Sequence, residues 1–501
     1  MKKVICATYD GNGAKIVEVE STLTKGLPSF SIVGMASTAI TEAKERVKSA
    51  LLSNNFSFPP KRITINLAPS DLKKEGSHFD LSMALLIALD NLSEDITQWA
   101  VFGELGLDGT VKENQLLYPL LLSLANQNLI SKAIVPQTSL EKLSKIPNIE
   151  FYGVDTLQEA LDIITANKEA VATSQSVIEY PFIELEEHKY YYTQEYKYDF
   201  KDIRGQEVAK RAALISAVGF HNILLEGSPG CGKSMIANRL RYILPPMNRE
   251  EILEIAKQDV LDMKEPLFKP HRNIRAPHHT STPSSIFGGG SQKAQIGEVA
   301  LAHKGILFFD ELPHFSKKVL EALREPMEDA KIRISRVNSK IEYMADFLFV
   351  GAMNPCPCGN LLDENKECRC SELEIQRYKN RLSEPFLDRI DINVVMQAVK
   401  SDDTPSYSSK EFHKIVIESF WFQKARKQSS FNAKLSDDEI EKFCILEDDA
   451  QDVLNKAIER FALSFRSIKK IKKVARSIAD IEKCEVIAKD HLLEALSYRR
   501  R

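Results

Sequence analysis

A glycine-rich run near the middle of the chain constrains the fold more than any other feature. Residues 227–234 read Gly-Ser-Pro-Gly-Cys-Gly-Lys-Ser and fit the pattern G-x-x-x-x-G-K-[ST]. An apolar strand predicted over Asn222–Glu226 leads into the run, and a helix predicted over Met235–Ile243 leads out of it. Backbone N–H groups of such a loop, with the N-terminus of the following helix, surround a phosphate. The run therefore predicts a P-loop nucleotide site in an α/β unit with a parallel sheet.

The residues of this loop have expected roles. Lys233 is expected to reach the β- and γ-phosphates of ATP, and Ser234 is expected to bind Mg²⁺. A chance glycine-rich turn is the alternative interpretation. The other residues expected to hold the nucleotide are Gly227, Ser228, Pro229, Gly230, Cys231 and Gly232.

Two acids support the nucleotide interpretation because they end a second apolar strand, Ile306–Asp310. Asp310 is expected to hold Mg²⁺, directly or through water, and Glu311 to orient and polarise the attacking water. A third apolar strand, Phe347–Ala352, is followed by Asn354, whose amide could place that water against the γ-phosphate. An asparagine before proline is otherwise a common turn residue. Together these motifs predict hydrolysis of ATP as well as binding.

Length and periodicity divide the chain into four parts. Its 501 residues exceed one ordinary core and suggest about three domains. We expect a mixed α/β domain over 1–168, a linker over 169–198, the nucleotide-binding core over 199–398 and a helical region over 399–501. The elements expected in the first domain are the strands Lys61–Ala68, Ala133–Pro136 and Ile149–Val154 and the helix Phe79–Leu92. The helices expected in the last region are Ser408–Ala425, Ser436–Phe443, Asp448–Phe461, Ser467–Ala479 and Lys489–Tyr498.

Charge and hydropathy limit the partners. The net charge is −3, so any nucleic-acid site has to be a local basic feature. We see neither a secretory signal nor a continuous apolar run of 18 residues, which predicts a cytoplasmic protein without a membrane span.

Four of the eight cysteines lie close together in the sequence. They form two C-x-C pairs separated by nine residues, Cys356 with Cys358 and Cys368 with Cys370. A structural Zn²⁺ takes four such ligands, although C-x₂-C is its more usual spacing. Four reduced thiols in a loop are an equally good interpretation. By contrast, His278 and His279 are expected to be local hydrogen-bonding residues rather than metal ligands.

Motifs spread over nearly the whole chain resemble those of the Mg-chelatase-like AAA+ family. They are Gly26–Gly34, Phe58–Pro69, Gly103–Gly109, Arg275–His279, Gly288–Gly290, Asn354–Gly359, Leu387–Asp391 and Val474–Asp480. The resemblance implies an α/β protein with a Lon-protease-like N-terminal domain, an AAA+ core and a C-terminal helical lid. It also implies an ATP-dependent, homohexameric DNA helicase or translocase that promotes branch migration during natural transformation. Its partners would be single-stranded and branched DNA and recombination proteins.

The resemblance assigns roles to arginines that the residues alone leave on the surface. Arg389 matches the arginine finger, which would enter the ATP site of a neighbouring subunit. Arg466 matches the sensor-2 arginine of the lid, and Asn354 the sensor-1 residue. Arg381 is a second candidate for the finger. Backbone groups near Ile203 and Gly205 would contact the adenine base.

Two basic features are candidates for DNA contact. Residues 331–344 alternate like a β-hairpin, and the resemblance implies that its tip, flanked by Arg336 and Lys340, points into the pore of a ring. A solvated hairpin tip is the alternative. The second feature is a set of basic residues at helical spacing, for which we expect a solvated face: Lys469, Lys470, Lys472, Lys473 and Arg476.

The N-terminal domain is expected to lack the peptidase activity of its Lon-like relatives. His78 stands where the nucleophilic serine would be, Ser77 lies one position early, and Tyr118 stands near the place of the activating lysine. Two other functions remain alternatives for the whole chain. One is a Mg-chelatase-type motor that remodels a partner for metal insertion, and the other is a non-enzymatic assembly protein that switches with nucleotide.

Overall fold

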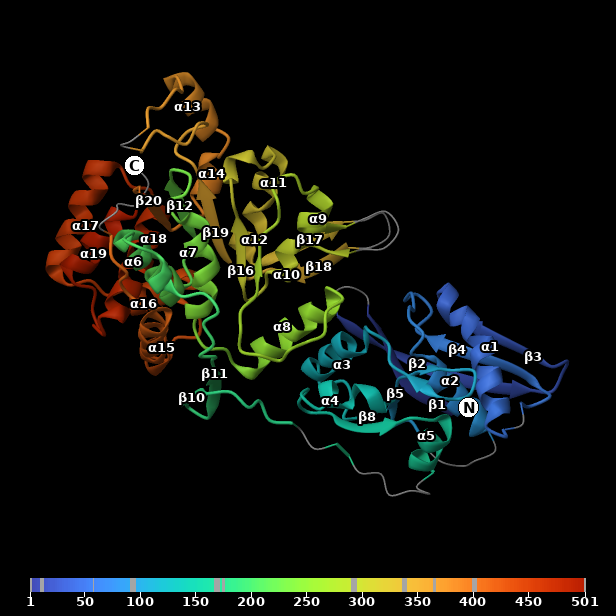
Figure 1. The fold of residues 1–501 in the computed structure, drawn as a ribbon. Helices are drawn as coiled ribbons and strands as arrows, with labels where there is room; N and C mark the ends of the chain where they lie inside the picture. Colours follow the sequence, from blue (N-terminus) through green and yellow to red (C-terminus); the bar gives the residue numbers. More distant parts are fainter. Residues whose placement is uncertain are drawn as a thin grey trace. The chain divides into compact units, whose positions relative to one another are not determined.

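The computed structural model describes residues 2–9, 13–56, 58–90, 96–165, 172–173, 176–289, 295–335, 340–363, 366–398 and 403–499. Only the backbone is described for Gln295, Ser335, Lys340 and Ile341. The chain forms two compact units, shown as a ribbon in Figure 1. The first contains Met1–Glu179 and Ala256–Phe268, and the second contains Tyr180–Ile255 and Lys269–Arg501.

The first unit is built on a seven-stranded mixed sheet. Its strands in spatial order are β3 (Ser29–Val33), β4 (Arg62–Ala68), β2 (Ala14–Thr24), β1 (Lys2–Tyr9), β5 (Ala100–Val101), β8 (Lys132–Pro136) and β9 (Glu150–Val154). The strands predicted near 61–68, 133–136 and 149–154 are confirmed as β4, β8 and β9. The long antiparallel pair of β1 and β2 was not predicted.

Helices cover this sheet, and one of them is buried almost all round. They are α1 (Thr38–Ser53), α2 (Asp80–Ala88), α3 (Leu117–Asn126), α4 (Leu140–Leu143) and α5 (Leu157–Ile164). A small ribbon is formed by β6 (Glu104–Leu105) and β7 (Val111–Lys112). In α2 every residue from Asp80 to Ile87 is buried, as expected for a helix that is apolar on all sides. It ends at Ala88, four residues before the predicted end.

The second unit contains a five-stranded sheet in which all strands are parallel. In spatial order they are β13 (Ile274–Arg275), β16 (Ile306–Phe309), β19 (Leu348–Met353), β12 (Ile223–Gly227) and β20 (Ile392–Met396). The three predicted apolar strands are confirmed as β12, β16 and β19. Because the strands are parallel, the loops that follow these three strands lie at the same edge of the sheet.

Helices and hairpins connect these strands. The helices are α6 (Glu207–Gly219), α7 (Lys233–Leu240), α8 (Arg249–Leu261), α9 (Pro283–Phe287), α10 (Glu298–Leu301), α11 (Lys317–Ala322), α12 (Arg324–Asp329), α13 (Glu372–Lys379) and α14 (Glu384–Leu387). One of these helices, α8, continues past Ile255 into residues of the first unit. The hairpins are β10 (Phe182–Leu185) with β11 (His188–Tyr191), β14 (Gly288–Gly289) with β15 (Gln295–Ile296), and β17 (Lys331–Ser335) with β18 (Lys340–Met344). The first hairpin lies in the segment predicted as a linker.

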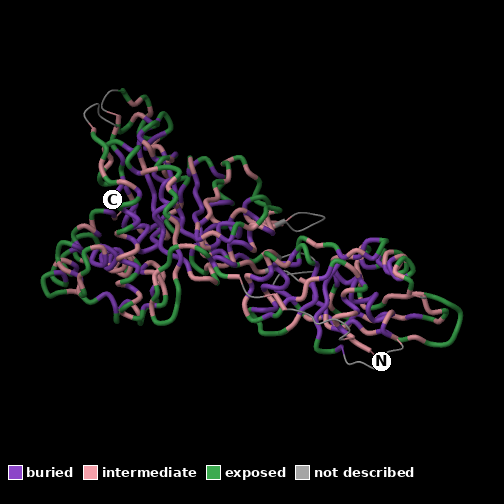
Figure 2. The backbone as a smooth tube through the Cα atoms, turned by 60° about the horizontal axis from the view of Figure 1, so that its bottom comes forward, coloured by how far each residue is buried: buried purple, intermediate pink, exposed green. Residues whose placement is uncertain are grey.

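The chain after 403 is helical, as predicted. Its helices are α15 (Ser409–Ala425), α16 (Asp437–Phe443), α17 (Asp448–Phe461), α18 (Phe465–Ile481) and α19 (Lys489–Ser497). They share a core with one face of the sheet, because Ile223 and Leu225 of β12 belong to the same buried cluster as Val474 and Ile478 of α18. In Figure 2 the buried stretches of backbone lie toward the inside of each unit, and the exposed stretches lie toward its outside. The α/β fold class with a helical C-terminal region is therefore confirmed.

The predicted solvated face of the basic helix is wrong for Arg476, and the four lysines of that face are half-buried. Arg476 on α18 is fully buried, and its Nε lies 3.0 Å from Oδ1 of the equally buried Asp480. Lys470 donates to the carbonyl oxygen of Ile390 over 3.3 Å, and Lys473 donates to that of Ala433 over 3.1 Å. Helical spacing showed which side chains share a face, but not that the face is buried at Arg476 and partly covered at its lysines.

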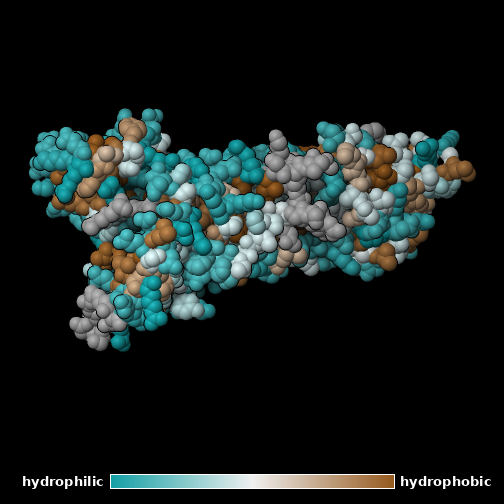
Figure 3. Space-filling view, turned by 90° about the horizontal axis from the view of Figure 1, so that it is seen from above, coloured by the Kyte–Doolittle hydropathy of each residue, from teal (hydrophilic) through white to brown (hydrophobic). Residues whose placement is uncertain are grey.

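The surface is mostly polar. Large exposed apolar side chains such as Leu27, Met263 and Phe465 are distant in sequence, and the face in Figure 3 is largely hydrophilic with small hydrophobic patches. No helix in the described ranges is long and apolar enough to cross a bilayer.

Candidate functional site

The P-loop has the local geometry that phosphate binding needs. It leaves β12 at Gly227 and enters α7 at Lys233. Gly230 and Gly232 have φ of 82° and 98°, a left-handed backbone that favours glycine. The hydroxyl of Ser228 is buried and has no hydrogen-bond partner in the described part of the chain. A buried donor left open inside a nest of backbone N–H groups fits an anionic ligand.

Lys233 lies inside this loop and connects it to the third strand. Its Nζ donates to the carbonyl oxygens of Gly227, over 2.6 Å, and Ser228, over 3.0 Å. It also donates to Oδ1 of Asn354 over 3.1 Å. The side chain is buried, so these acceptors hold the amine at the place where the phosphates are expected. The structure thus brings the P-loop lysine and the predicted sensor-1 residue together.

The two predicted Mg²⁺ ligands also meet. Ser234 Oγ donates to Oδ2 of Asp310 over 2.8 Å. A hydroxyl beside a carboxylate is an oxygen donor set of the kind that Mg²⁺ takes together with substrate phosphates. The next residue, Glu311, has φ of 51° and donates its backbone N–H to Oδ1 of Asp310 over 2.9 Å. A left-handed backbone at a residue other than glycine is strained, and such strain gathers at functional sites.

A histidine that we did not assign to the site contacts the predicted catalytic acid. Nδ1 of His279 lies 3.2 Å from Oε2 of Glu311. Its neighbour His278 makes the expected local hydrogen bond, with Nδ1 2.8 Å from Oγ1 of Thr280. His279 comes four residues after β13, so it reaches the same sheet edge as the acids. The signal in the sequence that could have identified it was its place in the family motif Arg275–His279.

The two predicted arginines lie at the other edge of the sheet. The carbonyl oxygen of Arg389 accepts from Nδ2 of Asn222, over 2.8 Å, just before β12 begins. The five residue steps from Asn222 to Gly227 span about 16 Å of extended strand. The backbone of Arg389 therefore lies at the end of β12 opposite to the P-loop of the same chain.

Arg389 and Arg466 share one partner that the sequence did not suggest. The guanidinium of Arg389 contacts Oε2 of Glu328 on α12 and donates to the carbonyl oxygen of Arg324 over 3.2 Å. Arg466 donates to Oε1 of Glu328 over 3.1 Å. The two cations thus converge on a single carboxylate. The weaker finger candidate, Arg381, donates to the carbonyl oxygen of Pro313 over 3.2 Å.

The other sequence candidates in this unit are placed as follows. Ile203 is buried, and the backbone N–H of Gly205 donates to the carbonyl oxygen of Thr404 over 3.3 Å. Arg336 lies outside the described residues. Lys340 pairs through its backbone with Ser335 in the β17–β18 hairpin, and its side chain is outside the described part.

The four cysteines converge. Cys356 Sγ lies 3.4 Å from Sγ of Cys358 and 3.7 Å from Sγ of Cys368, and the last two sulfurs are 3.6 Å apart. With Cys370, all four sulfurs lie within 4.8 Å of one another. Hydrogen bonds from the backbone N–H groups of Asn360 and Arg369 lower the pKa of the Cys358 thiol to about 6. The donor set therefore fits a tetrahedral thiolate metal site.

In the first unit, the side chains that the structure shows bonded to Ser77 are a carboxylate and an amide, not the lysine amine of a Lon-type site. His78 is buried, with Nε2 2.8 Å from the carbonyl oxygen of Ala7, and burial lowers its pKa to about 4. Ser77 Oγ donates to Oε2 of Glu104 and accepts from Nδ2 of Asn114 over 3.1 Å. Tyr118 is fully buried. These partners are consistent with the expected lack of peptidase activity, which stays a prediction.

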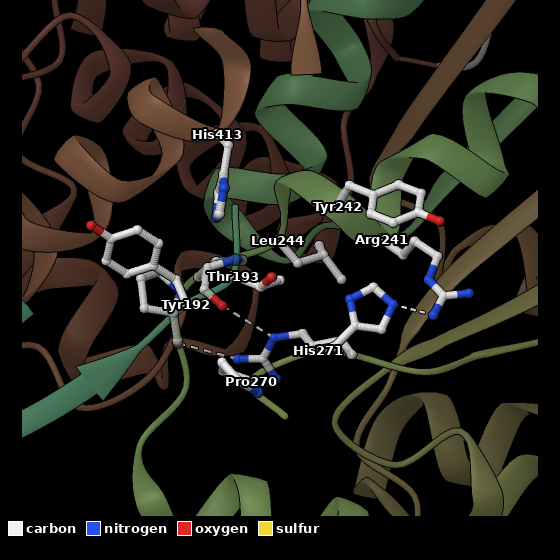
Figure 4. Close-up of a pocket in the computed structure, with 11 residues that line it drawn as sticks. Tyr192, Thr193, Arg241, Tyr242, Leu244, Pro270, His271 and His413 are labelled. Carbon is white, nitrogen blue, oxygen red and sulfur yellow. Dashed lines mark hydrogen bonds between the residues drawn. The ribbon is translucent and has the colours of Figure 1, made fainter. Parts of the chain in front are cut away.

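A small cavity lies away from the nucleotide residues, between the segment after β11 and α15 (Figure 4). His271 and His413 line it, and burial lowers the pKa of each imidazole to about 4. Nδ1 of His413 lies 2.9 Å from Oη of Tyr196. With a volume of about 10 Å³, the cavity has room for one water and no larger ligand.

Three family descriptions match successive parts of this chain. "Subunit ChlI of Mg-chelatase" matches residues 19–139, "Magnesium chelatase, subunit ChlI" matches 199–404, and "Magnesium chelatase, subunit ChlI C-terminal" matches 406–499.

Curated relatives extend this similarity over the full length. The chain is 37% identical to competence protein ComM of Haemophilus influenzae, with 98% of this chain and 95% of the relative covered. It is 36% identical to the uncharacterized protein YifB of Escherichia coli over the same shares. The magnesium-chelatase 67 kDa subunit of Heliobacterium mobile is 23% identical, with 30% of this chain and 27% of the relative covered.

Proposed function

This chain belongs to the family of magnesium chelatase subunit ChlI and is a competence-related, Mg-chelatase-like AAA+ protein, and from that premise we propose that it is a hexameric, ATP-driven DNA motor that promotes branch migration. One observation carries the motor half of the proposal. Lys233, Asn354 and the Ser234–Asp310 pair, which come from three strands, meet at one edge of the sheet. The DNA half is supported by the full-length similarity to a competence protein.

Each residue at this edge has a chemical task in hydrolysis. The amine of Lys233 would exchange Asn354 for phosphate oxygens, which frees the Asn354 amide to hold the attacking water. Ser234 and Asp310 would hold Mg²⁺, which neutralises phosphate charge when bound. Glu311 would accept the proton of the water, and His279 is placed to keep the carboxylate in position until then.

Hydrolysis requires a neighbouring subunit in this proposal. The backbone of Arg389 lies about 16 Å from its own P-loop, at the other end of β12. Its side chain therefore cannot reach the nucleotide of its own chain while the strand is intact. Arg466 shares Glu328 with it and is expected to act on the same side. Both arginines would therefore serve the γ-phosphate held by an adjacent copy.

The hairpin that we propose contacts DNA is joined directly to elements that carry nucleotide-site residues. In the chain, the β17–β18 hairpin lies between α12, which carries Glu328, and β19, which is followed by Asn354. Its base is charge-paired, because Arg333 Nε lies 3.0 Å from Oε2 of Glu342 and Lys331 Nζ lies 2.9 Å from Oε1 of the same residue. Arg336 and Lys340 near the tip are the proposed phosphate contacts.

A branch-migration assay tests the proposal. A three-strand or four-strand DNA substrate is incubated with wild type, Lys233→Ala and the surface control Lys414→Ala, each with ATP and Mg²⁺. Wild type and Lys414→Ala should convert the substrate at equal rates, and Lys233→Ala should not. Conversion by Lys233→Ala at the wild-type rate, or by none of the three, would contradict the proposal.

The Mg-chelatase-type motor is the second candidate, because the three family descriptions and the 67 kDa subunit name that enzyme. The two candidates differ in what should stimulate the ATPase. Branched DNA should raise the ATPase rate of a DNA motor several-fold. An ATPase rate that does not change with DNA but rises with a porphyrin-binding partner protein would favour the chelatase function.

A further inference from the structure

The structure assigns a second metal centre to this chain: Cys356, Cys358, Cys368 and Cys370 hold one Zn²⁺, and that ion clamps the P-loop and Asn354 from outside the nucleotide site. The zinc assignment stands on the cysteines alone. Its effect on nucleotide rests on the ATP site proposed above.

The sulfur positions match a tetrahedral ion. Four thiolates at a Zn–S distance of about 2.3 Å lie about 3.8 Å from one another in a regular tetrahedron. The three measured separations are 3.4, 3.6 and 3.7 Å, and the fourth sulfur lies within 4.8 Å of all the others. With all four sulfurs bound as thiolates, the complex would have a charge of −2.

Two disulfides do not explain this arrangement. A pair of disulfides predicts two close sulfur pairs that are separate from each other, with S–S of about 2.05 Å in each. Here Cys356, Cys358 and Cys368 are nearly equidistant. The backbone N–H of Cys370 also donates to Cys368 Sγ, and that of Asn360 donates to Cys358 Sγ. Backbone N–H groups directed at sulfur are a usual part of the surroundings of a thiolate metal site.

The first cysteine pair is packed on the P-loop. Gly359, directly after Cys358, has φ of 81°, and a Cβ there would lie 2.6 Å from Cδ of Pro229. Only a glycine allows this approach. Asn354 precedes Cys356 by one proline, so the ion would fix the chain on both sides of the contact with Pro229.

The second pair leads into a helix that reaches the same loop from the other side. Cys370 is followed by Ser371, the N-cap of α13. Near the end of α13, Tyr378 accepts a hydrogen bond from the backbone N–H of Asn354, and Lys379 Nζ lies 3.0 Å from Oε1 of Glu226, which precedes Gly227. The four sulfurs therefore join two segments that flank the P-loop.

Zinc and nucleotide should consequently stabilise each other. If the ion orders the segments that touch Pro229, Asn354 and Glu226, removing it loosens the loop that must surround phosphate. Because binding couplings are reciprocal, bound nucleotide should in turn protect the zinc from a chelator.

The test compares three variants of the full chain with wild type, all purified without chelator. Cys368→Ser/Cys370→Ser removes two ligands. Gly359→Ala keeps all four ligands but pushes against Pro229. Cys484→Ser, a cysteine outside the cluster, is the matched control. Zinc is measured by elemental analysis, and affinity for a fluorescent ADP analogue is measured by titration.

Wild type, Gly359→Ala and Cys484→Ser should hold about one zinc per chain, and Cys368→Ser/Cys370→Ser close to none. ADP affinity should fall roughly five- to tenfold in Cys368→Ser/Cys370→Ser and in Gly359→Ala, and stay unchanged in Cys484→Ser. Iron, no metal, or disulfides found by mass spectrometry in wild type would overturn the zinc assignment. Unchanged ADP affinity in the zinc-free variant would overturn the clamp. A wild type that holds zinc but binds no ADP would overturn the proposed ATPase and the clamp, and leave the zinc assignment standing.

Discussion

Oδ1 of Asn354 accepts a hydrogen bond from Nζ of Lys233 over 3.1 Å. The amide that follows β19 and the amine that begins α7 thus hold each other at the carboxyl edge of the sheet. A γ-phosphate that draws the amine away would release the amide. We therefore expect Asn354 to matter for turnover rather than for binding.

Asn354→Ala should separate these two steps. The amine of Lys233 keeps its two carbonyl partners, so ATP affinity should change less than about threefold, while turnover should fall about 10²-fold because the attacking water loses its orienting amide. Equilibrium binding of a nucleotide analogue and a phosphate-release assay measure the two quantities. Asn380→Ala, on the surface at the end of α13, is the control. A parallel loss of affinity and turnover would show that the amide supports binding instead.

Mixing two inactive variants should restore activity. Arg389→Ala lacks the finger and should lose about 10³-fold or more in turnover, and Lys233→Ala lacks the phosphate-binding amine. In a mixed ring, the P-loop of an Arg389→Ala subunit can meet the intact finger of a Lys233→Ala subunit. The mixture should therefore hydrolyse ATP well above either variant alone. No recovery in mixed assemblies confirmed by native mass spectrometry would place both residues in one subunit's site.

The buried ion pair of α18 should dominate the stability of the helical region. Arg476→Ala leaves the buried Asp480 short of one cation and should lower the free energy of unfolding by about 3–5 kcal/mol. Lys472→Ala, on the same helix and half-buried, should change it by about 0.5 kcal/mol or less. Urea unfolding followed by circular dichroism measures both. Equal effects of the two substitutions would mean that the pair contributes little.

Acid should destabilise the second unit through its buried histidines. Burial holds the pKa of His413 at about 4, below the value of about 6.5 in an unfolded chain. The unfolded chain therefore binds more protons as the pH falls, and stability is lost between about pH 6.5 and pH 4. From pH 8 to pH 5 this single group should cost about 2 kcal/mol.

His413→Gln is the comparison for this effect. It cannot titrate, so its stability should fall about 2 kcal/mol less than that of wild type over the same pH range. His271 also has a pKa of about 4 and stays in both proteins, so the difference isolates His413. Identical pH profiles of the free energy of unfolding would show that folding does not lower the pKa of His413.

The sequence predicted those parts of the fold in which local pattern and packing agree. β12, β16 and β19 are continuous apolar runs beside recognisable motifs, and a strand buried on both faces has to look that way. β13 has two residues, too few for any periodicity. The β1–β2 pair depends on register between strands, which a single apolar pattern does not specify.

The same distinction holds for the site. Lys233, Ser234, Asp310 and Asn354 could be predicted because each follows a strand that ends at one edge. Glu328 could not be found, because its importance lies in two arginines that are 61 and 138 residues away in the sequence. Arg476 was misjudged for a related reason: helical spacing describes one helix, and burial is decided by the elements that pack against it.

The carboxylate of Glu328 has a consequence for assembly. In a single chain it pairs with both Arg389 and Arg466, so one negative charge is shared between two cations. In the proposed ring, the γ-phosphate of an adjacent copy has to compete for them. ATP would then strengthen the association between copies as well as drive the motor. Each copy that binds it would offer the neighbour's arginines an anion with more negative charge than Glu328. Without ATP, this proposal predicts weaker association between copies, with both arginines still bound to Glu328.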